Sequence, residues 1–477
     1  MVFIDKDAIN AELVKLLAER DPDRRNIAEI SAILKSGADP NAFDGVGSSA
    51  LNIASRQNDP ISTELLLKHG ADPNMPNKFG EPPLNYVLLS NMYDDIYSVV
   101  KLLIEAGADI NKYSSDQTGE ILPPLYLACR HQTIDIIKLL VMSGADVNVR
   151  IGSYSPCIVD AAYVGFNERV SLFIEYGADV NAKNADGRTA LYYAASEGYY
   201  EIVKTLIEHG ADVNIADNKG LTPLYKCFHN AYSECASDRF ENTAMALINA
   251  GADINIIDSS GNSMLHRATA VGMAVATEKL LELGADPCLK NQQGTPPLYM
   301  AAISANERII SMLLDRGADI NFRGPDGKTA LFHVARQNEP TGTKLLLKLG
   351  ADPNIADCSG NTPLHAACSY GCVGNISALV RHGANLDAKN SAGDTPLMEL
   401  ARRGTVSAMK RLLKAGADMS AVNNKGQTAM DILQKKHYSK GEEFFKYIRE
   451  IKVRAAQEQL QKEDCDMSLG STPDFSI

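Results

Sequence analysis

The sequence predicts an all-α solenoid, a linear stack of short helix pairs, on two observations. A Gly-Ala-Asp or Gly-Ala-Asn triplet occurs twelve times, and most of the gaps between successive triplets are equal, at a period of about 33 residues. Between triplets the apolar residues follow a helical spacing, as Ile202, Val203, Leu206 and Ile207 do. Two helices of about ten residues cannot bury such faces alone, so each unit needs copies of itself on both sides.

Residues 184–216 show the unit most clearly. Asp186-Gly187 predicts a turn, residues 189–195 predict a first helix that Gly198 interrupts, and residues 201–209 predict a second helix that ends at Gly210. A glycine fits the left-handed position that closes a helix, and the Asp and Asn that follow it favour a tight turn.

The first helix of several units begins with a shared Thr-Pro-Leu motif. It occurs at Thr222-Pro223-Leu224, Thr362-Pro363-Leu364-His365 and Thr395-Pro396-Leu397. Proline in the first turn loses no hydrogen bond, and the threonine before it can cap the helix. With this motif and the repeat period, the chain resembles the ankyrin-repeat family over roughly residues 30–451.

The resemblance implies a curved superhelix of 12 to 13 repeats, each with a helix-turn-helix and a finger like a β-hairpin. We predict four segments: an N-terminal helical cap with the first repeat at 1–43, the repeat array at 44–422, a C-terminal capping repeat with a charged helix at 423–463, and a disordered tail at 464–477. In the charged helix, Phe444, Phe445, Ile448 and Ile451 are expected to face inward.

Departures from the period predict three insertions and one irregular unit. Extra residues fall around Asn91–Asp94, in the finger Lys112–Leu122, and within Asn230–Asn242, where they should lengthen the connection between two helices. Pro156-Cys157-Ile158-Val159 stands where Thr-Pro-Leu-His is expected, so the helices of that unit should be less regular.

Composition excludes several classes of function. A formal net charge of −12 and a pI near 5.3 argue against nucleic acid as a partner, because that would require a basic stripe. The sequence has no 18-residue apolar run and no signal-peptide core, which predicts an intracellular protein, cytoplasmic or nuclear, with no membrane partner. Nine scattered cysteines indicate a reducing compartment.

Neither a metal nor any other cofactor is expected. Cys358, Cys368 and Cys372 lie close in sequence, with His365 among them. In the repeat register, however, Cys358 falls in the turn, His365 at the family's structural histidine and Cys368 at a small buried position of the first helix. The chain has no nucleophile beside a base and no phosphate-binding glycine loop, which predicts a protein without catalytic activity. His209 and His382 precede helix-closing glycines and should cap those helices.

Recognition remains, with three hypotheses. The first is an intracellular scaffold or adaptor that binds another protein, as a monomer. The second is an effector of an intracellular bacterium or virus that binds a host protein, and the source organism would separate it from the first. The third is an enzyme whose site lies in the insertions or the tail, where few residues are available.

The family's concave groove implies which residues contact a partner. In register, the candidates are Arg130, Tyr154, Tyr163, Val164, Arg188, Glu197, Tyr199, Tyr200, Lys219, Arg336, Tyr370, Arg402 and Arg403. They mix both signs of charge, so a polyanion or a strongly basic tail is expected to be a poor partner. Tyr192 and Tyr225 replace the motif histidine and should bond neighbouring turns, whereas Tyr154, Tyr163, Tyr199 and Tyr200 are expected to be free to anchor a partner.

The resemblance also suggests a modification. Asn148 and Asn214 lie in Asp-Val-Asn turns, with Leu140 and Leu206 eight residues earlier, which is similar to the asparagine-hydroxylation pattern of ankyrin repeats.

Overall fold

The computed structural model describes residues 6–19, 26–89, 96–112, 114–115, 121–131, 133–149, 155–231, 237–436, 439, 442, 444–450 and 453. The chain forms two compact units, residues 1–230 with 238–252, and residues 231–237 with 253–477. Each unit is an array of helix pairs, and each is described by itself.

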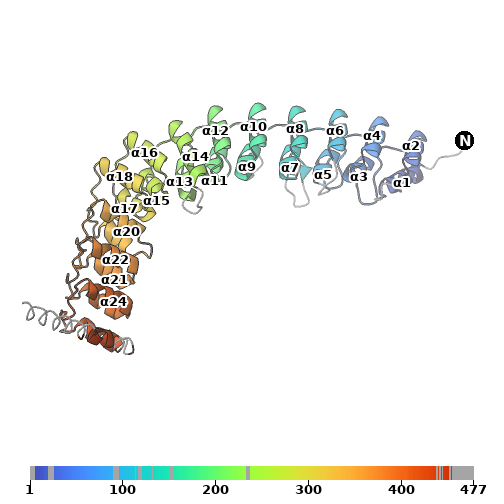
Figure 1. The fold of residues 1–477 in the computed structure, drawn as a ribbon. Helices are drawn as coiled ribbons and strands as arrows, with labels where there is room; N and C mark the ends of the chain where they lie inside the picture. The colour runs from blue at the N-terminus through green and yellow to red at the C-terminus, as the bar shows by residue number, and fades with distance from the viewer. Residues whose placement is uncertain are drawn as a thin grey trace, which may run out of the picture. The chain divides into compact units, whose positions relative to one another are not determined.

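The described residues of unit 1 form seven helix pairs. They are α1 (Lys6–Leu17) with α2 (Ile27–Lys35), α3 (Ala50–Arg56) with α4 (Pro60–Lys68), α5 (Pro83–Leu88) with α6 (Tyr97–Glu105), α7 (Pro124–His131) with α8 (Ile134–Met142), α9 (Cys157–Val164) with α10 (Asn167–Glu175), α11 (Ala190–Glu197) with α12 (Tyr200–Glu208), and α13 (Pro223–Ala231) with α14 (Ser237–Asn249). The odd-numbered helices form one row and the even-numbered helices a second row beside it (Figure 1).

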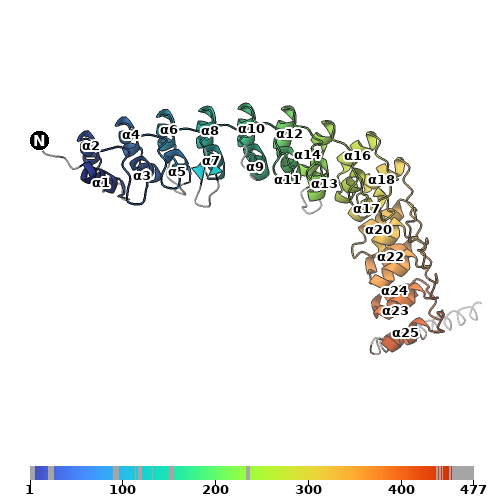
Figure 2. The same cartoon turned by 180° about the vertical axis from the view of Figure 1, so that it is seen from behind.

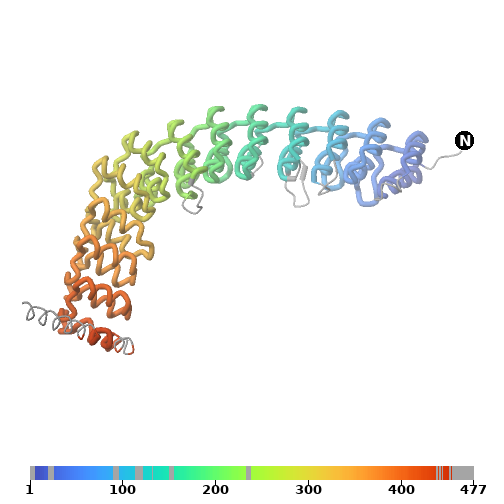
Figure 3. Tube along the Cα trace, in the orientation of Figure 1, coloured from blue at the N-terminus to red at the C-terminus, as the bar shows by residue number. Residues whose placement is uncertain are grey.

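Unit 2 repeats the arrangement, with five pairs and a last helix in its described part. They are α15 (Met264–Val271) with α16 (Ala274–Glu282), α17 (Pro297–Ser304) with α18 (Glu307–Asp315), α19 (Ala330–Ala335) with α20 (Thr341–Lys348), α21 (Pro363–Tyr370) with α22 (Val373–Arg381), α23 (Pro396–Arg403) with α24 (Val406–Lys414), and then α25 (Ala429–Lys436). Figure 2 shows α23, α24 and α25 from behind, and Figure 3 traces the same helix-loop-helix path from pair to pair. We call the odd-numbered helices the first helices and the even-numbered helices the second helices.

Caps and left-handed glycines fix the ends of the helices. The Thr189 Oγ1 accepts a hydrogen bond from the Tyr192 N–H at 3.2 Å, and α11 ends at Gly198, whose φ is +70°. Thr362 caps α21 in the same way, together with His365. Thr395 is an exception, because its side chain makes no capping hydrogen bond although its backbone has the extended N-cap conformation. The predicted threonine cap is therefore wrong at that position.

The core lies between the two rows of helices. Leu191 of α11 and Val203 and Leu206 of α12 are fully buried, as are the equivalent Leu224 and Leu247 of the next pair. Each such side chain stabilises the fold by roughly 1.5–3 kcal/mol through burial. Ile207 is only half-buried, so the predicted apolar face of α12 is confirmed for Ile202, Val203 and Leu206.

Two ladders of hydrogen bonds join successive helix pairs. One links the fingers that precede the first helices, and the other links the turns that follow the second helices. The fingers are linked by backbone bonds such as Asn218 N to Asp186 O at 2.9 Å. Gly187 is required there, because its φ is +77° and an added Cβ would lie 2.5 Å from the Asn218 side chain. In the turns, the Asn148 Nδ2 donates to Gly177 O at 2.9 Å, and its Oδ1 accepts from the Asp179 N–H at 2.7 Å.

The turn ladder bears on the suggested modification. Asn148 is engaged through both of its polar side-chain atoms, and Asn214 donates to Gly251 O at 3.2 Å. A hydroxylating enzyme would have to open this ladder to reach either residue, so their modification remains a prediction.

Three details of the array differ from expectation. The insertion near residue 237 lengthens α14 to 13 residues, so it does not only extend the connection between helices. The unit around Pro156 has regular helices of 8 and 9 residues, because Pro156 takes the N-cap position and Gly165, with φ +89°, closes α9. Near the C-terminus Phe444 is buried but Phe445 is 54% exposed, so Phe445 does not face inward. The centre of the first insertion, Tyr154 and Ile451 lie outside the described residues.

The predicted finger at Lys112–Leu122 contains two short strands. β1 (Ser114–Ser115) and β2 (Ile121–Leu122) pair antiparallel, with Ser114 opposite Leu122.

Candidate functional site

An aromatic cluster lies across the first helices α9 and α11. The Tyr163 ring meets the Tyr193 ring edge to face, with centroids 5.1 Å apart and planes at 70°. Tyr193 in turn meets Tyr192 at 5.7 Å and 79°. These T-shaped contacts match the geometry that aromatic quadrupoles favour. At the end of the row, Tyr163 is 56% exposed, so the row runs from the interior to solvent.

Polar side chains of the neighbouring fingers form hydrogen bonds and cation–π contacts with the tyrosines of this cluster. The Asn184 Nδ2 donates to the Tyr193 hydroxyl oxygen at 3.1 Å, and the Arg188 guanidinium lies over the rings of both Tyr192 and Tyr193. The Tyr192 hydroxyl donates to Asp217 Oδ2 at 3.0 Å. The prediction that Tyr192 bonds a neighbouring turn is confirmed.

Asp217 is the buried anion of the cluster. Burial by itself would raise the pKa of its carboxyl group, but the N–H groups of Leu221 and Lys219 and the Tyr192 hydroxyl donate hydrogen bonds to it, and the net effect is a lowered pKa. Burial and the bond to this carboxylate raise the pKa of Tyr192. The rings are therefore fixed by a charge network, which lowers the entropy cost of binding against them.

A pocket of about 520 Å³ opens beside Tyr163, between α7, α9 and α10. Its lining consists of Cys129, Arg130, Cys157, Asp160, Ala161, Tyr163, Val164, Phe166, Arg169 and Phe173. The Arg169 guanidinium stacks 4.3 Å from the Phe166 centroid and donates from Nη1 to Cys129 O at 2.8 Å. Burial raises the pKa of Asp160, while a bond to Ser155 and the charge of Arg130 oppose that shift. The pocket combines apolar walls with an exposed cation, Arg130.

The predicted contact residues of unit 1 fall into two groups. Arg130, Tyr163, Val164, Tyr200 and Lys219 are exposed, and they are available to a partner. Glu197, Tyr199 and Arg188 are half-buried. Tyr199 packs against the backbone of Gly165, where an added Cβ would lie 2.8 Å from its ring, so it is not free as expected. Arg188, predicted as an exposed turn residue, pairs with Asp186 and Asp217 instead.

Tyr193 was not among the predicted contact residues, although its ring contacts both Tyr163 and Tyr192. A sequence signal for it exists: Ser196 is the register equivalent of Tyr163 in the next repeat, and Tyr193 lies one helical turn before Ser196. Residues three positions apart share one face of a helix, so Tyr193 lies on the face that Ser196 presents at the position of Tyr163.

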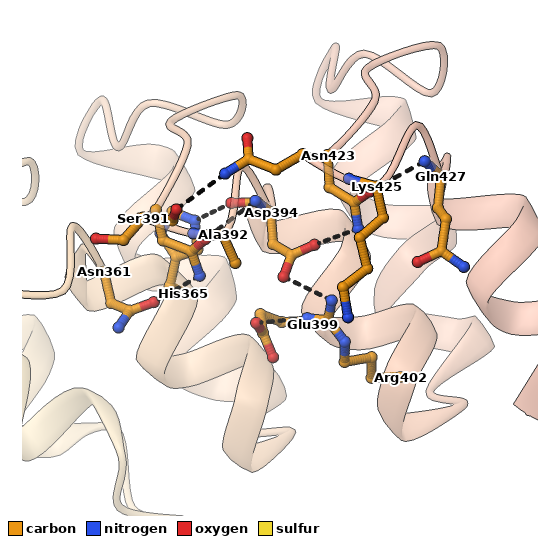
Figure 4. Close-up of polar contacts among 12 residues, drawn as sticks. Asn361, His365, Ser391, Ala392, Asp394, Glu399, Arg402, Asn423, Lys425 and Gln427 are labelled. Atoms are coloured by element: carbon orange, nitrogen blue, oxygen red, sulfur yellow. Dashed lines mark hydrogen bonds and ion pairs between the residues drawn. The ribbon is translucent and has the colours of Figure 1, made fainter.

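The predicted residues of unit 2 form a different arrangement. The Arg336 guanidinium stacks 4.7 Å from the centroid of Tyr370, which is 47% exposed, and it donates to the Tyr370 hydroxyl oxygen at 2.7 Å. Arg402 forms ion pairs with Asp394 at 2.5 Å and with Glu399 at 3.0 Å (Figure 4). Arg402 is therefore half-buried and held by the fold, which corrects its assignment as a groove contact, while Arg403 is exposed.

Histidine side chains in both units have structural roles. His365 caps α21 with Thr362 and bonds through Nε2 to Asp394 O at 2.9 Å, across to the next repeat (Figure 4). Burial lowers the pKa of His365. His209 and His382 donate from Nδ1 to the carbonyl oxygens of Thr205 and Ala378, at 2.8 and 2.9 Å, which confirms their capping role.

The described residues contain no group of three His, Cys, Asp or Glu side chains placed to hold a metal ion. Within the same residues, no helix combines the length and the apolar character that crossing a membrane demands.

Comparison with known proteins agrees with the architecture. The model for ankyrin repeats in three copies matches residues 8–114, 51–151, 158–238, 234–324 and 318–390, and the model for a single ankyrin repeat matches residues 392–424. No curated protein matches the chain. Ankyrin repeats are in general protein-protein interaction modules and are typically not catalytic. Because the matches span residues 8–424 in an all-α array of helix pairs, this chain belongs to the ankyrin-repeat family.

Proposed function

We propose that the chain is a non-catalytic scaffold or adaptor that binds another protein on the first helices of unit 1, with Tyr163 as the central anchor. The observation that carries this proposal is the position of Tyr163: the residue is 56% exposed, its ring contacts the Tyr193 ring, and it borders the open pocket of about 520 Å³. A braced aromatic ring beside a pocket is the usual form of a binding hot spot.

The surroundings of Tyr163 support the same role. Val164 is 53% exposed and Phe166 is 44% exposed, so an apolar patch continues from the ring along the edge of the pocket. Arg130 adds a cation to the lining of the pocket. A partner segment with an apolar side chain for the pocket and a polar group for Arg130 would satisfy both.

The test compares partner capture by the full chain, by Tyr163→Ala and by Tyr176→Ala. Tyr176 is a matched control, because it is 40% exposed in the same helix pair but lies at the end of the second helix α10. We expect Tyr163→Ala to weaken the capture of proteins from the cells of origin by at least roughly tenfold, since an anchor contributes about 2 kcal/mol or more. Equal loss of the captured proteins in both variants, or in neither, would reject the proposal.

A further inference from the structure

Four successive first helices of unit 2 end in pairs of residues that become more basic towards the C-terminus. The equivalent pairs are Arg336 and Gln337 after α19, Ser369 and Tyr370 in α21, Arg402 and Arg403 in α23, and Lys435 and Lys436 in α25. Positions 369/370, 402/403 and 435/436 follow one another at the repeat period, so these side chains lie at the same level of neighbouring repeats. We call Arg336, Tyr370, Arg403, Lys435 and Lys436 the basic row.

The charge of the surrounding sequence reinforces the row. Residues 396–454 contain thirteen Lys or Arg and six Asp or Glu, a surplus of seven positive charges in a chain whose net charge is −12. A local cationic surface on an acidic protein concentrates anionic groups near it.

The cations of the row remain available to a ligand. Arg336 uses one nitrogen on the Tyr370 hydroxyl, and Arg403 uses Nη1 on Ser369 O at 3.2 Å, which leaves each guanidinium with further donors. Lys435 and Lys436 are exposed. Of the nearby carboxylates, Asp394 and Glu399 pair with Arg402, and the charge of Lys436 also acts on Glu399.

A pocket of about 490 Å³ lies beside the row, and its lining includes Arg336, Ser369 and Tyr370. Asp394 and Glu399 also line it, and both carboxylates pair with Arg402, so the side chain that enters is expected to be neutral. We propose that the basic row binds an acidic peptide segment of a partner protein, with one of its side chains in this pocket. The identification of the partner as a protein rests on the proposed function; the charge of the segment rests on the row. Arginine and lysine pair with carboxylates along the segment, and the exposed face of Tyr370 packs on its backbone or apolar side chains.

A peptide fits this row better than nucleic acid does. Double-stranded DNA carries one charge per about 1.7 Å of its axis, and its binding needs a dense, continuous basic stripe. Here the cations follow the repeat steps and are interrupted by Tyr370 and by the Glu399–Arg402 ion pair. An acidic segment with carboxylates at intervals matches that spacing more closely.

The row has a simpler explanation that the experiment must exclude. Cations in the last turn of a helix stabilise it through the helix dipole, without binding anything. A stabilising role predicts a lower melting temperature for variants and no change in peptide affinity. A binding role predicts weaker peptide affinity for the variants and an unchanged melting temperature.

The test measures the affinity of the full chain for a fluorescein-labelled peptide of alternating Glu and Ala by fluorescence anisotropy at low and high salt. The variant is Arg403→Glu with Lys436→Glu. The control is Lys101→Glu with Lys204→Glu on second helices of unit 1, whose side chains are 52% and 53% exposed. We expect about tenfold weaker binding for the variant, a smaller loss for the control, and weaker binding at high salt.

Three further samples decide the class of partner. A peptide with Gln in place of Glu, a single-stranded DNA oligonucleotide and phosphatidylserine vesicles should all bind more weakly than the Glu peptide. Equal affinity of the Gln peptide, tighter binding of DNA or vesicles, or unchanged affinity in the variant would overturn the proposal. Tyr163→Ala should leave the Glu peptide affinity unchanged, so failure here is distinguishable from failure of the proposed function.

Discussion

The Tyr163 cluster of unit 1 and the Asp394 cluster of unit 2 use similar groups for different ends. In both, a carboxylate that is nearly inaccessible, Asp217 or Asp394, pairs with an arginine whose side chain is 28% or 32% exposed. In unit 1 the network ends in the exposed ring of Tyr163 beside a pocket. In unit 2 it closes on itself, because Arg402 is shared by Asp394 and Glu399, and Asn423 donates to Asp394 at 2.9 Å.

This difference distinguishes networks that only fix side chains in place from networks that also present a side chain to a partner. A buried anion in a repeat joint does not by itself mark a binding site, since the Asp394 network is satisfied inside the protein. Unit 1 differs because its network positions an aromatic side chain, Tyr163, that stays exposed to solvent. The following changes test that distinction, from the largest expected effect to the smallest.

Leucine-to-alanine substitutions in the second helices should create cavities that destabilise the array locally. They test whether destabilising the repeat near one cluster leaves the other cluster folded. Leu206 of α12 and Leu379 of α22 are fully buried at equivalent positions, four residues before Gly210 and Gly383. We expect Leu206→Ala and Leu379→Ala each to cost about 2–5 kcal/mol. Hydrogen exchange should locate the lost protection in the mutated pair and its neighbours, and uniform loss over both units would contradict a quasi-linear array.

Removal of either buried carboxylate should cost similar stability but affect binding differently. Asp217→Ala and Asp394→Ala each leave an arginine without its main partner, at a cost of roughly 1–3 kcal/mol in urea unfolding. Asp217→Ala also releases Tyr192 and Arg188, so it should weaken partner capture through Tyr163. If Asp394→Ala weakened that capture equally, the distinction between the two clusters would be wrong.

The pH dependence of stability should have opposite signs in the two clusters. The pKa of Asp217 is lowered, so its contribution is present above the ordinary value of 3.8 and is lost as the pH falls through the folded pKa. Burial raises the pKa of Glu399, so its contribution is present below the ordinary value of 4.5 and is lost as the pH rises through the folded pKa.

Urea unfolding of Asp217→Asn and Glu399→Gln at a series of pH values measures both effects. The stability deficit of Asp217→Asn should shrink as the pH falls below about 3.8. Relative to wild type, Glu399→Gln should gain stability as the pH rises above 4.5. The same pH slope in both variants would contradict the assignment.

Substitutions at two helix ends outside both clusters show how much a change in backbone conformation alone alters stability. Ala305 closes α17 with φ +52°, where the preceding pair has Gly272 with φ +85°. Ala305→Gly should stabilise the protein by about 0.5–1 kcal/mol, and Gly272→Ala should destabilise it by a similar amount. An added Cβ at Gly272 has its nearest neighbour at 3.9 Å, so the cost there is conformational and not steric. Thermal unfolding that moved both variants in the same direction would contradict this account.

Most of the fold could be predicted from the sequence because its determinants are local and periodic. The glycine triplets, the threonine caps and the apolar faces each act within one repeat or between adjacent repeats. The predictions that were wrong involved particular replacements: the regular α9 after Pro156, the extension of α14, and Phe445. The regularity of α9 comes from Pro156 at its N-cap and Gly165 at its end, residues that differ from the family motif but serve the same positions. The length of α14 and the exposure of Phe445 are not specified by the repeat spacing.

The candidate site was less predictable, because exposure is a property of contacts between repeats. Register alone placed Arg188, Tyr199 and Arg402 on the binding face with Tyr163 and Arg403. Only the structure shows that Arg188 and Arg402 are held by buried carboxylates and that Tyr199 packs on Gly165.

The sequence by itself determined that this chain is a stack of ankyrin repeats, since no single helix pair can bury its own apolar face and the period supplies the neighbours. The tertiary structure alone decided which polar and aromatic side chains remain for a partner. The physical reason is that a charge or a ring is engaged or left free by atoms of the adjoining repeat, and that pairing depends on side-chain directions that repeat spacing does not specify.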